Sequence, residues 1–164
     1  MNYKKYERIL NYGITKCPVE SAAYMLIHNF LDDLYEYEET CVISAVGLRK
    51  KRDLRLDTLG GISDIYIVSN DFKYQSDEGE CFGCVEIKSP TEKLIYGDQI
   101  FYQKKTYSNV IYTNGIIWEF YKDSILEWDI NLSDGALLFS LVDININHVK
   151  YYELIKKLLD IKWK

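Results

Sequence analysis

Three polar residues at the ends of two strand-like segments have the types and spacing needed for metal-assisted chemistry. Asp64 lies in segment 60–68 (GGISDIYIV), and Glu86 and Lys88 close segment 84–88 (CVEIK). Residues two apart on a strand point to one face, so Glu86 and Lys88 project together, and Asp64 joins them if the strands pair. Adjacent carboxylates repel unless a cation such as Mg²⁺ lies between them. With a lysine to orient or deprotonate a water, these are the parts of metal-assisted phosphodiester hydrolysis.

The bare pattern Asp-x₂₁-Glu-x-Lys is loose, because 27% of the residues are charged. Two structural readings stay open beside the catalytic one. Asp64 could be a polar residue at a strand edge, and Glu86 and Lys88 could form an ion pair on a solvated face. The placement of both segments at strand ends, with a helix-like segment directly after Lys88, favours the catalytic reading.

Composition is that of a globular protein. The 164 residues allow one domain, 1–164, with 48% apolar residues. Apolar runs are shorter than a membrane span and the N-terminal residues resemble no signal peptide, so we expect a cytoplasmic protein without a membrane partner.

The chain has a net charge of −5, but segment 49–55 (RKKRDLR) is strongly basic. It lies shortly before Asp64 and could contact a phosphate backbone, although a solvated surface loop is an equal alternative. The candidate nucleic-acid contacts in this run are Arg49, Lys50, Lys51, Arg52 and Arg55.

Four cysteines raise the question of a metal or a disulfide. Cys81 and Cys84 have the spacing of half a zinc site, but no second such pair follows them. We therefore expect reduced, structural thiols.

The order of elements predicts an α/β fold. We expect helices over 3–11, ended by Gly13, and from Pro18 to about Tyr37. Strands are expected over 40–46, 62–68 and 81–88, a helix from about Glu92 to Tyr107, and a hairpin turning at Asn114-Gly115. A further strand is expected over 125–130, a strand or a buried segment over 136–142, and a final amphipathic helix over 149–161. This order predicts a central mixed β-sheet flanked by helices.

Three segments resemble one known family. Glu86-Ile87-Lys88-Ser89-Pro90, Gln99-Ile100 and the stretch 112–121 (YTNGIIWEFY) are similar to the N-terminal nuclease domain of type I restriction enzyme R subunits. That family belongs to the PD-(D/E)xK superfamily, so the resemblance implies a restriction-endonuclease-like fold and Mg²⁺-dependent (or Mn²⁺-dependent) cleavage of DNA. It covers about residues 60–121.

Carried over to this sequence, the resemblance implies that Asp64 and Glu86 hold the metal, with the backbone carbonyl of Ile87 as a further ligand. Lys88 would position the attacking water, with a pKa lowered by partial burial. The family also has an acidic residue on the helix before the sheet, a place that Glu20 occupies, although Glu20 could simply complement the helix dipole.

The family carries a Gln-x-x-x-Tyr element on the helix after the ExK strand, and two glutamines of this chain could occupy its first position. Gln99 lies closest to the expected distance from Glu86, and Gln103 follows one turn later, with Tyr107 four residues beyond. We favour Gln99 as the catalytic residue and take Gln103 as a contact to nucleic acid.

The sequence thus predicts a metal-dependent DNA endonuclease of the R-subunit N-terminal type. No Gly-x-x-x-x-Gly-Lys motif occurs, so we expect a nuclease without a translocase, which is a free-standing domain, a fragment or a small relative that works with a partner. DNA is the expected partner, with a homodimer or a larger restriction or repair assembly compatible with the family. The alternative is a catalytically weak or inactive nuclease-like module that binds nucleic acid or a partner protein, which the net acidity favours.

Overall fold

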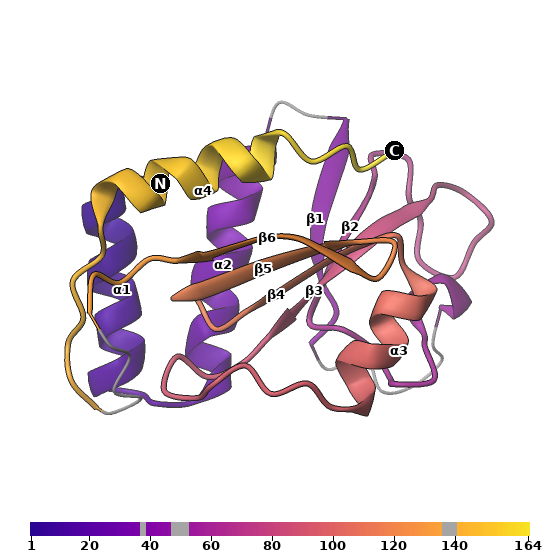
Figure 1. Cartoon of the computed structure of the whole chain (residues 1–164). Helices are drawn as coiled ribbons and strands as arrows, with labels where there is room; N and C mark the ends of the chain where they lie inside the picture. The colour runs from indigo at the N-terminus through magenta and orange to yellow at the C-terminus, as the bar shows by residue number, and fades with distance from the viewer. Residues whose placement is uncertain (37–38, 47–52, 136–140) are drawn as a thin grey trace.

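The computed structural model describes residues 1–36, 39–46, 53–135 and 141–164, and in these residues a six-stranded mixed sheet is flanked by helices (Figure 1). This confirms the predicted α/β fold class. The helices are α1 (Tyr3–Thr15), α2 (Glu20–Tyr35), α3 (Asp98–Thr106) and α4 (His148–Leu159), and a 3-10 turn, η1, spans Leu54–Leu56. The strands are β1 (Thr40–Ser44), β2 (Ile65–Ser69), β3 (Cys81–Ile87), β4 (Asn109–Thr113), β5 (Ile117–Lys122) and β6 (Ile125–Asn131).

The strands lie side by side in the order of the sequence, and each neighbouring pair is antiparallel except β3 and β4. The connection that contains α3 crosses over one face between β3 and β4, as a parallel pair requires. Ile65 of β2 is paired with Val85 of β3. The residue before Ile65 therefore comes opposite the residue after Val85, so the register alone brings Asp64 beside Glu86.

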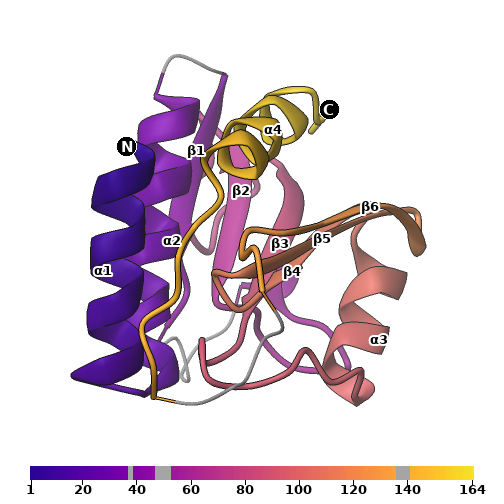
Figure 2. The ribbon, with the colours of Figure 1, turned by 60° about the vertical axis from the view of Figure 1, so that its left-hand side comes forward.

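Separate hydrophobic cores cover the two faces of the sheet. On one face, α1, α2 and α4 pack over side chains that include Ile65, Val85 and Ile87. On the other face, α3 packs over side chains that include Tyr66 and Cys84. Figure 2 shows α1 and α2 on one side of the sheet and α3 on the other. Because Glu86 alternates with Val85 and Ile87, it faces α3.

The first helix is longer than predicted. It continues through Gly13 to Thr15, whereas the sequence suggested that Gly13 would end it. A Cβ added at Gly13 would lie 3.5 Å from the Cβ of Ala22, so the glycine lies where α1 and α2 pack closely. The next helix begins at Glu20, two residues after Pro18, and buries a row of apolar residues that includes Ala23, Ile27 and Leu31.

The third helix is shorter than predicted, beginning at Asp98 instead of about Glu92. Tyr112 of β4 and Glu119 of β5 hold the preceding segment on the sheet. The hydroxyl of Tyr112 accepts from the Ile95 N–H (3.1 Å) and donates to the Ile95 carbonyl (2.8 Å), and Tyr96 donates to Glu119. Segment 136–142 was expected to be a strand or a buried segment, but only Leu141 and Val142 are described, and both are exposed and outside any strand. Among the described residues, no helix is long and apolar enough to cross a membrane.

Candidate active site

Asp64 and Glu86 lie together where β2 begins and β3 ends, with Glu86 toward α3 and Asp64 near Tyr24 of α2. Asp64 stands just before β2, and its Oδ2 accepts a hydrogen bond from the backbone N–H of Ile87 at 2.7 Å. The side chain thus binds the backbone of β3 at the point where β2 begins. The backbone carbonyl of a residue points to the same strand edge as its N–H, so the Ile87 carbonyl also faces the Asp64 side.

Glu86 is almost fully buried, and both of its oxygens are occupied. Oε1 accepts from Lys88 Nζ at 2.7 Å. Oε2 accepts from Gln99 Nε2 at 3.0 Å and from Gln103 Nε2 at 2.7 Å. Three donors from β3 and α3 therefore converge on a single buried carboxylate, which balances part of its desolvation cost.

The two carboxyl groups raise the cost of each other's charge. Burial raises the pKa of Asp64 to about 7, and repulsion from Glu86 adds to burial while the Ile87 N–H opposes both. Burial likewise raises the pKa of Glu86, although the charge of Lys88 and its hydrogen bond counteract this in part. A divalent cation between the two groups would remove this repulsion, and their oxygens suit a hard cation.

The pKa of Lys88 is raised, whereas we expected it to be lowered. Burial alone would lower the pKa of Lys88, but the hydrogen bond and negative charge of Glu86 raise it more, so the net shift is upward. The expectation of a lowered pKa was wrong, because it considered burial without the ion pair. In this arrangement Lys88 is an ammonium group that donates hydrogen bonds and balances charge.

Glu20 reaches the site through a neighbour that sequence reasoning missed. The hydroxyl of Tyr24, one turn later on α2, donates to Glu20 Oε1 and also forms a hydrogen bond with Asp64. The negative charge of Glu20 acts on Asp64, Glu86 and Lys88. The i, i+4 spacing of Glu20 and Tyr24 was the sequence signal that could have revealed this pair.

The two glutamines of α3 both bind Glu86, so the structure does not separate them by that contact. Gln99 is partly exposed, at the end of α3 nearest the loop that follows Lys88. Gln103 is fully buried, and its amide nitrogen donates to Glu86. The prediction that Gln103 contacts nucleic acid is therefore not compatible with its position, since a phosphate cannot reach a side chain enclosed between α3 and the sheet.

The basic run contributes little to the described site. Arg49, Lys50, Lys51 and Arg52 lie outside the described residues. Arg55 is used within the chain: its guanidinium binds both oxygens of Asp53 and the carbonyls of Lys73, Glu78 and Gly79, and it stacks 4.1 Å from the centroid of Phe72. All five N–H groups are occupied by these contacts, so Arg55 joins loop 70–80 to η1 instead of presenting donors to a phosphate.

The carboxylate oxygens of Asp64 and Glu86 are of the type that binds a metal ion, but they are not arranged as a complete coordination site. Among the described residues, no group of three or more His, Cys, Asp or Glu side chains is placed to hold a metal ion. The four cysteines are free thiols, as expected, and burial raises the pKa of Cys81 to about 12. A cation at Asp64 would have to draw Glu86 away from one of its present donors.

The turn that carries most of the sequence resemblance is a structural support. Asn114 Oδ1 accepts from the N–H groups of Ile116 and Ile117, and Gly115 has a φ of +82°, which favours glycine. Tyr6 donates to the Gly115 carbonyl at 2.7 Å, and Trp118 is fully buried beside Phe30. Asn114 also donates to the Glu92 carbonyl, so this turn fixes the start of the segment that leads to α3.

Comparison with known proteins supports the fold. No protein-family model matches the chain, and no curated protein does either. A chain in the solved structure described as "cryoEM structure DrdV-DNA complex" matches with a TM-score of 0.62 and 12% sequence identity. The match covers 97% of this chain and 14% of that chain. At this identity the likeness shows the fold, over nearly the whole of the described chain, and the narrower resemblance to R subunits stays a prediction.

Proposed function

We propose that this chain is a metal-dependent deoxyribonuclease that hydrolyses phosphodiester bonds as an endonuclease of the R-subunit N-terminal type. The observation that carries the proposal is the meeting of Asp64, Glu86 and Lys88 at the adjoining ends of β2 and β3, with Glu20 linked to them through Tyr24. The likeness to a chain from a protein–DNA complex supports the choice of DNA.

Each side chain has a distinct part in this proposal. Asp64 and Glu86, with the carbonyl of Ile87, would hold a Mg²⁺ or Mn²⁺ ion. When bound, such an ion polarises the scissile phosphate and stabilises the negative charge that builds on it. Lys88 orients the attacking water and balances the charge of Glu86, while Gln99 and Gln103 fix the Glu86 carboxylate against α3. Tyr24 holds Glu20 at the side of Asp64.

A second candidate is a module that binds nucleic acid or a partner protein without cleaving it. The occupied oxygens of Glu86 favour this reading, because Lys88, Gln99 and Gln103 already satisfy a carboxylate that a catalytic metal would need. In such a module the cluster would serve to attach α3 to the sheet.

The experiment that tests cleavage is incubation with supercoiled, linear and single-stranded DNA in Mn²⁺, in Mg²⁺ and in EDTA, with the Asp64→Asn variant in parallel. We expect at least one DNA form to be cut with metal and none in EDTA, and no cutting by the variant. Cutting that persists in EDTA or in Asp64→Asn would refute the proposal.

A titration with Mn²⁺ separates the two candidates. A nuclease site should bind the ion and raise the temperature of thermal unfolding, and Asp64→Asn should remove that effect. A protein that binds DNA but shows no difference between wild type and Asp64→Asn in this titration would be the non-catalytic module.

A further inference from the structure

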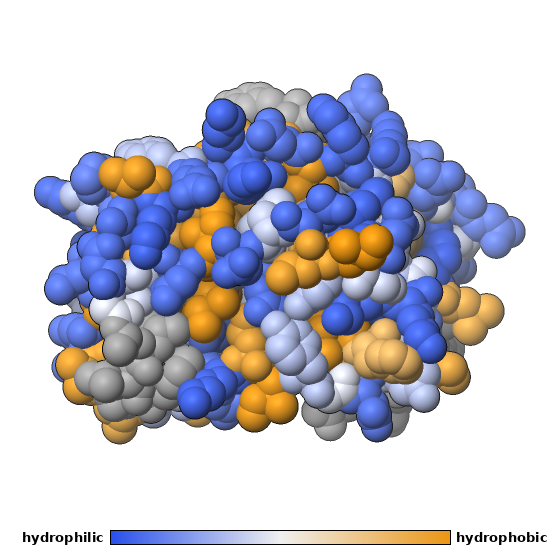
Figure 3. All heavy atoms as spheres, viewed as in Figure 1, coloured by the Kyte–Doolittle hydropathy of each residue, from blue (hydrophilic) through white to orange (hydrophobic). Residues whose placement is uncertain are grey.

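Large apolar side chains are exposed around the start of α3, close to the residue that contacts Glu86. A Cβ added at Gly60 would lie 2.8 Å from the Cα of Gln99, so the turn before β2 packs directly on α3. The exposed side chains near this contact are Leu59 (89% exposed), Ile95 (73%), Tyr96 (57%) and Phe101 (48%). Figure 3 shows apolar atoms reaching the surface over α3 among hydrophilic neighbours. Large exposed apolar patches on a protein mark interaction surfaces, whereas single exposed apolar side chains are normal.

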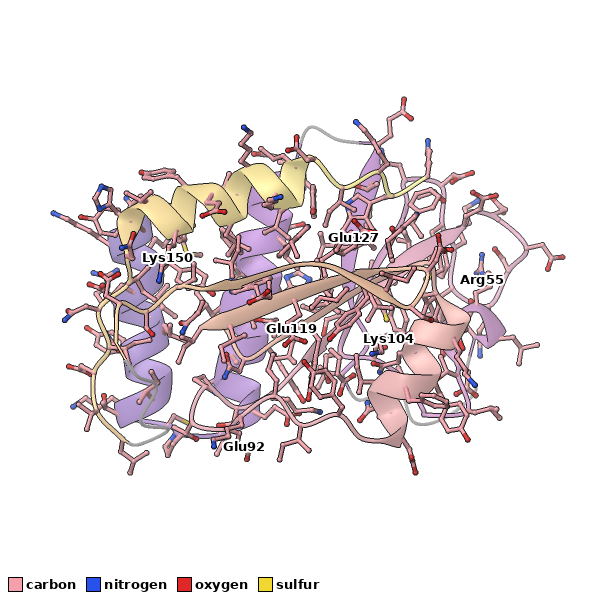
Figure 4. The ribbon with its side chains drawn as sticks, in the orientation of Figure 1. Arg55, Glu92, Lys104, Glu119, Glu127 and Lys150 are labelled. Atoms are coloured by element: carbon pink, nitrogen blue, oxygen red, sulfur yellow. The ribbon has the colours of Figure 1, made fainter. Side chains whose placement is uncertain are left out.

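Two lysines border this patch on the later turns of α3. Lys105 Nζ lies 4.2 Å from the ring centroid of Phe101, and Lys104 Nζ lies 4.1 Å from that of Tyr121. Lys104 projects from α3 toward the sheet (Figure 4). Among the residues that the structure describes, neither lysine forms a salt bridge with a carboxylate. We refer to Leu59, Ile95, Tyr96, Phe101, Lys104 and Lys105 as the α3 rim.

The two sides of α3 have different contacts. At 3.6 residues per turn, Phe101 and Lys105 project away from the side on which Gln99 and Gln103 bind Glu86. Asp98 lies one turn before Phe101 and places a negative charge at the start of the helix. Positive charge is therefore confined to the end of the helix, and the exposed rings and apolar side chains lie toward its start.

We propose that the α3 rim binds single-stranded DNA, with Phe101 as the surface on which an unpaired base stacks and Lys104 and Lys105 as phosphate contacts. The proposal builds on the deoxyribonuclease function and adds the form of its substrate. Aromatic side chains bind unpaired bases of any sequence through stacking, and lysines beside them follow the backbone. A duplex keeps its bases stacked on one another, so it would leave the exposed rings and apolar side chains of the rim without partners.

A purely structural use of these residues is the main alternative. A ring and a lysine four residues apart stabilise a helix without any ligand. The chain contains a matched pair for this comparison: Tyr152 and Lys156 have the same spacing on an exposed face of α4, and Tyr152 is 54% exposed. The two pairs have the same i, i+4 spacing on a helix, but only the α3 pair belongs to the helix that contacts Glu86.

The test measures binding without cleavage, in EDTA, by fluorescence anisotropy of a labelled oligothymidylate and of a blunt duplex of equal length. Phe101→Leu should weaken binding of the single strand about tenfold or more, and Phe101→Trp should keep it, because tryptophan also stacks. Lys105→Gln should reduce the slope of log affinity against log salt by roughly 0.7. Tyr152→Leu and Lys156→Gln should bind as wild type does.

Preference for the duplex over the single strand would overturn the proposal, and so would a Phe101→Leu variant that binds as well as Tyr152→Leu. Loss of binding in both Phe101→Leu and Phe101→Trp would also exclude stacking as the cause. Because the assay contains no metal, its result is independent of catalysis. A rim that binds single strands in a protein that never cuts DNA would leave this inference standing while refuting the nuclease.

Discussion

At the scale of single residues, the central feature is a pair of buried carboxyl groups with unequal partners. Glu86 has Lys88 and two amide donors, whereas Asp64 has the Ile87 N–H and the Tyr24 hydroxyl. Burial of Asp64 beside Glu86 is unfavourable for the charged form and is retained at a cost in stability. Such an arrangement is typical of sites that bind a cation or a proton.

Asp64 should make the stability of the protein fall as the pH rises. Its pKa is raised to about 7, so between about pH 4 and pH 7 the folded protein holds a proton that the unfolded chain has lost. The free energy of unfolding therefore decreases across this interval. In EDTA at pH 8, Asp64→Asn should be more stable than wild type by about 1–3 kcal/mol in denaturant titrations.

Asp129→Asn, a change at an exposed carboxylate of β6, is the control and should leave this pH dependence unchanged. Added Mn²⁺ should reverse the order by stabilising the wild type and not Asp64→Asn. A wild type whose stability is constant from pH 4 to pH 8 would show that Asp64 titrates as an ordinary surface carboxylate.

Tyr24 should act on metal affinity as a positioning residue. Its hydroxyl joins Glu20 to Asp64, and loss of a group that orients ligands usually costs metal affinity about 10-fold to 100-fold. We expect Tyr24→Phe to raise the Mg²⁺ concentration for half-maximal cleavage by about that factor, with a smaller change in the rate at saturating metal. Tyr12→Phe, at an exposed residue of α1, is the control. Equal metal dependence of the two variants would remove Tyr24 from the site.

At the scale of elements, the parts predicted well are those that local patterns specify. The apolar, β-branched runs within 62–68 and 81–88 predicted β2 and β3, because such residues favour an extended backbone. Asn114-Gly115 predicted the β4–β5 turn, because its side-chain and backbone hydrogen bonds are local. The pairing of β2 and β3 then follows, and with it the meeting of Asp64 and Glu86.

The parts predicted poorly depend on contacts between distant segments. The start of α3 was placed too early because Tyr112 and Glu119 hold segment 91–97 on the sheet, and neither contact is visible in that segment's own sequence. Gly13 was taken as a helix end because its packing against α2 cannot be seen from α1 alone. Gln103 was assigned to the surface because helical spacing could not show which side of α3 meets the sheet.

Gly60 should be essential for the placement of α3. A Cβ at this position would lie 2.8 Å from both the Cα and the carbonyl oxygen of Gln99, so Gly60→Ala must shift α3 or the turn. We expect cleavage to fall by at least about tenfold, because Gln99 would no longer fix Glu86 in position. Gly97→Ala is the control, since no atom lies within 4 Å of its added Cβ and its φ is −105°. Equal activity in both variants would show that the position of α3 has no influence on the chemistry.

At the scale of the whole molecule, one face of the sheet carries most of the hydrophobic core and the other carries most of the polar contacts of the candidate site. The face under α1, α2 and α4 holds most of the large buried side chains, among them Trp118, Phe30 and Tyr151. The face under α3 holds Glu86 with its three donors and the hydrogen bonds of Tyr96 and Tyr112. Changes to the site should therefore alter activity more than they alter folding, which allows its residues to be tested one at a time.

The most direct test is the rate at which supercoiled plasmid is cut in Mg²⁺ or Mn²⁺ by wild type and by Lys88→Ala. Lys73→Ala is the matched control, because Lys73 pairs with Glu78 at 2.6 Å as Lys88 pairs with Glu86, but in an exposed loop. We predict that Lys88→Ala folds and cuts at least about 100-fold more slowly, the usual scale of a proton-transfer or water-orienting group, while Lys73→Ala cuts at the wild-type rate. Cleavage by Lys88→Ala at the wild-type rate would contradict the catalytic assignment of Asp64, Glu86 and Lys88.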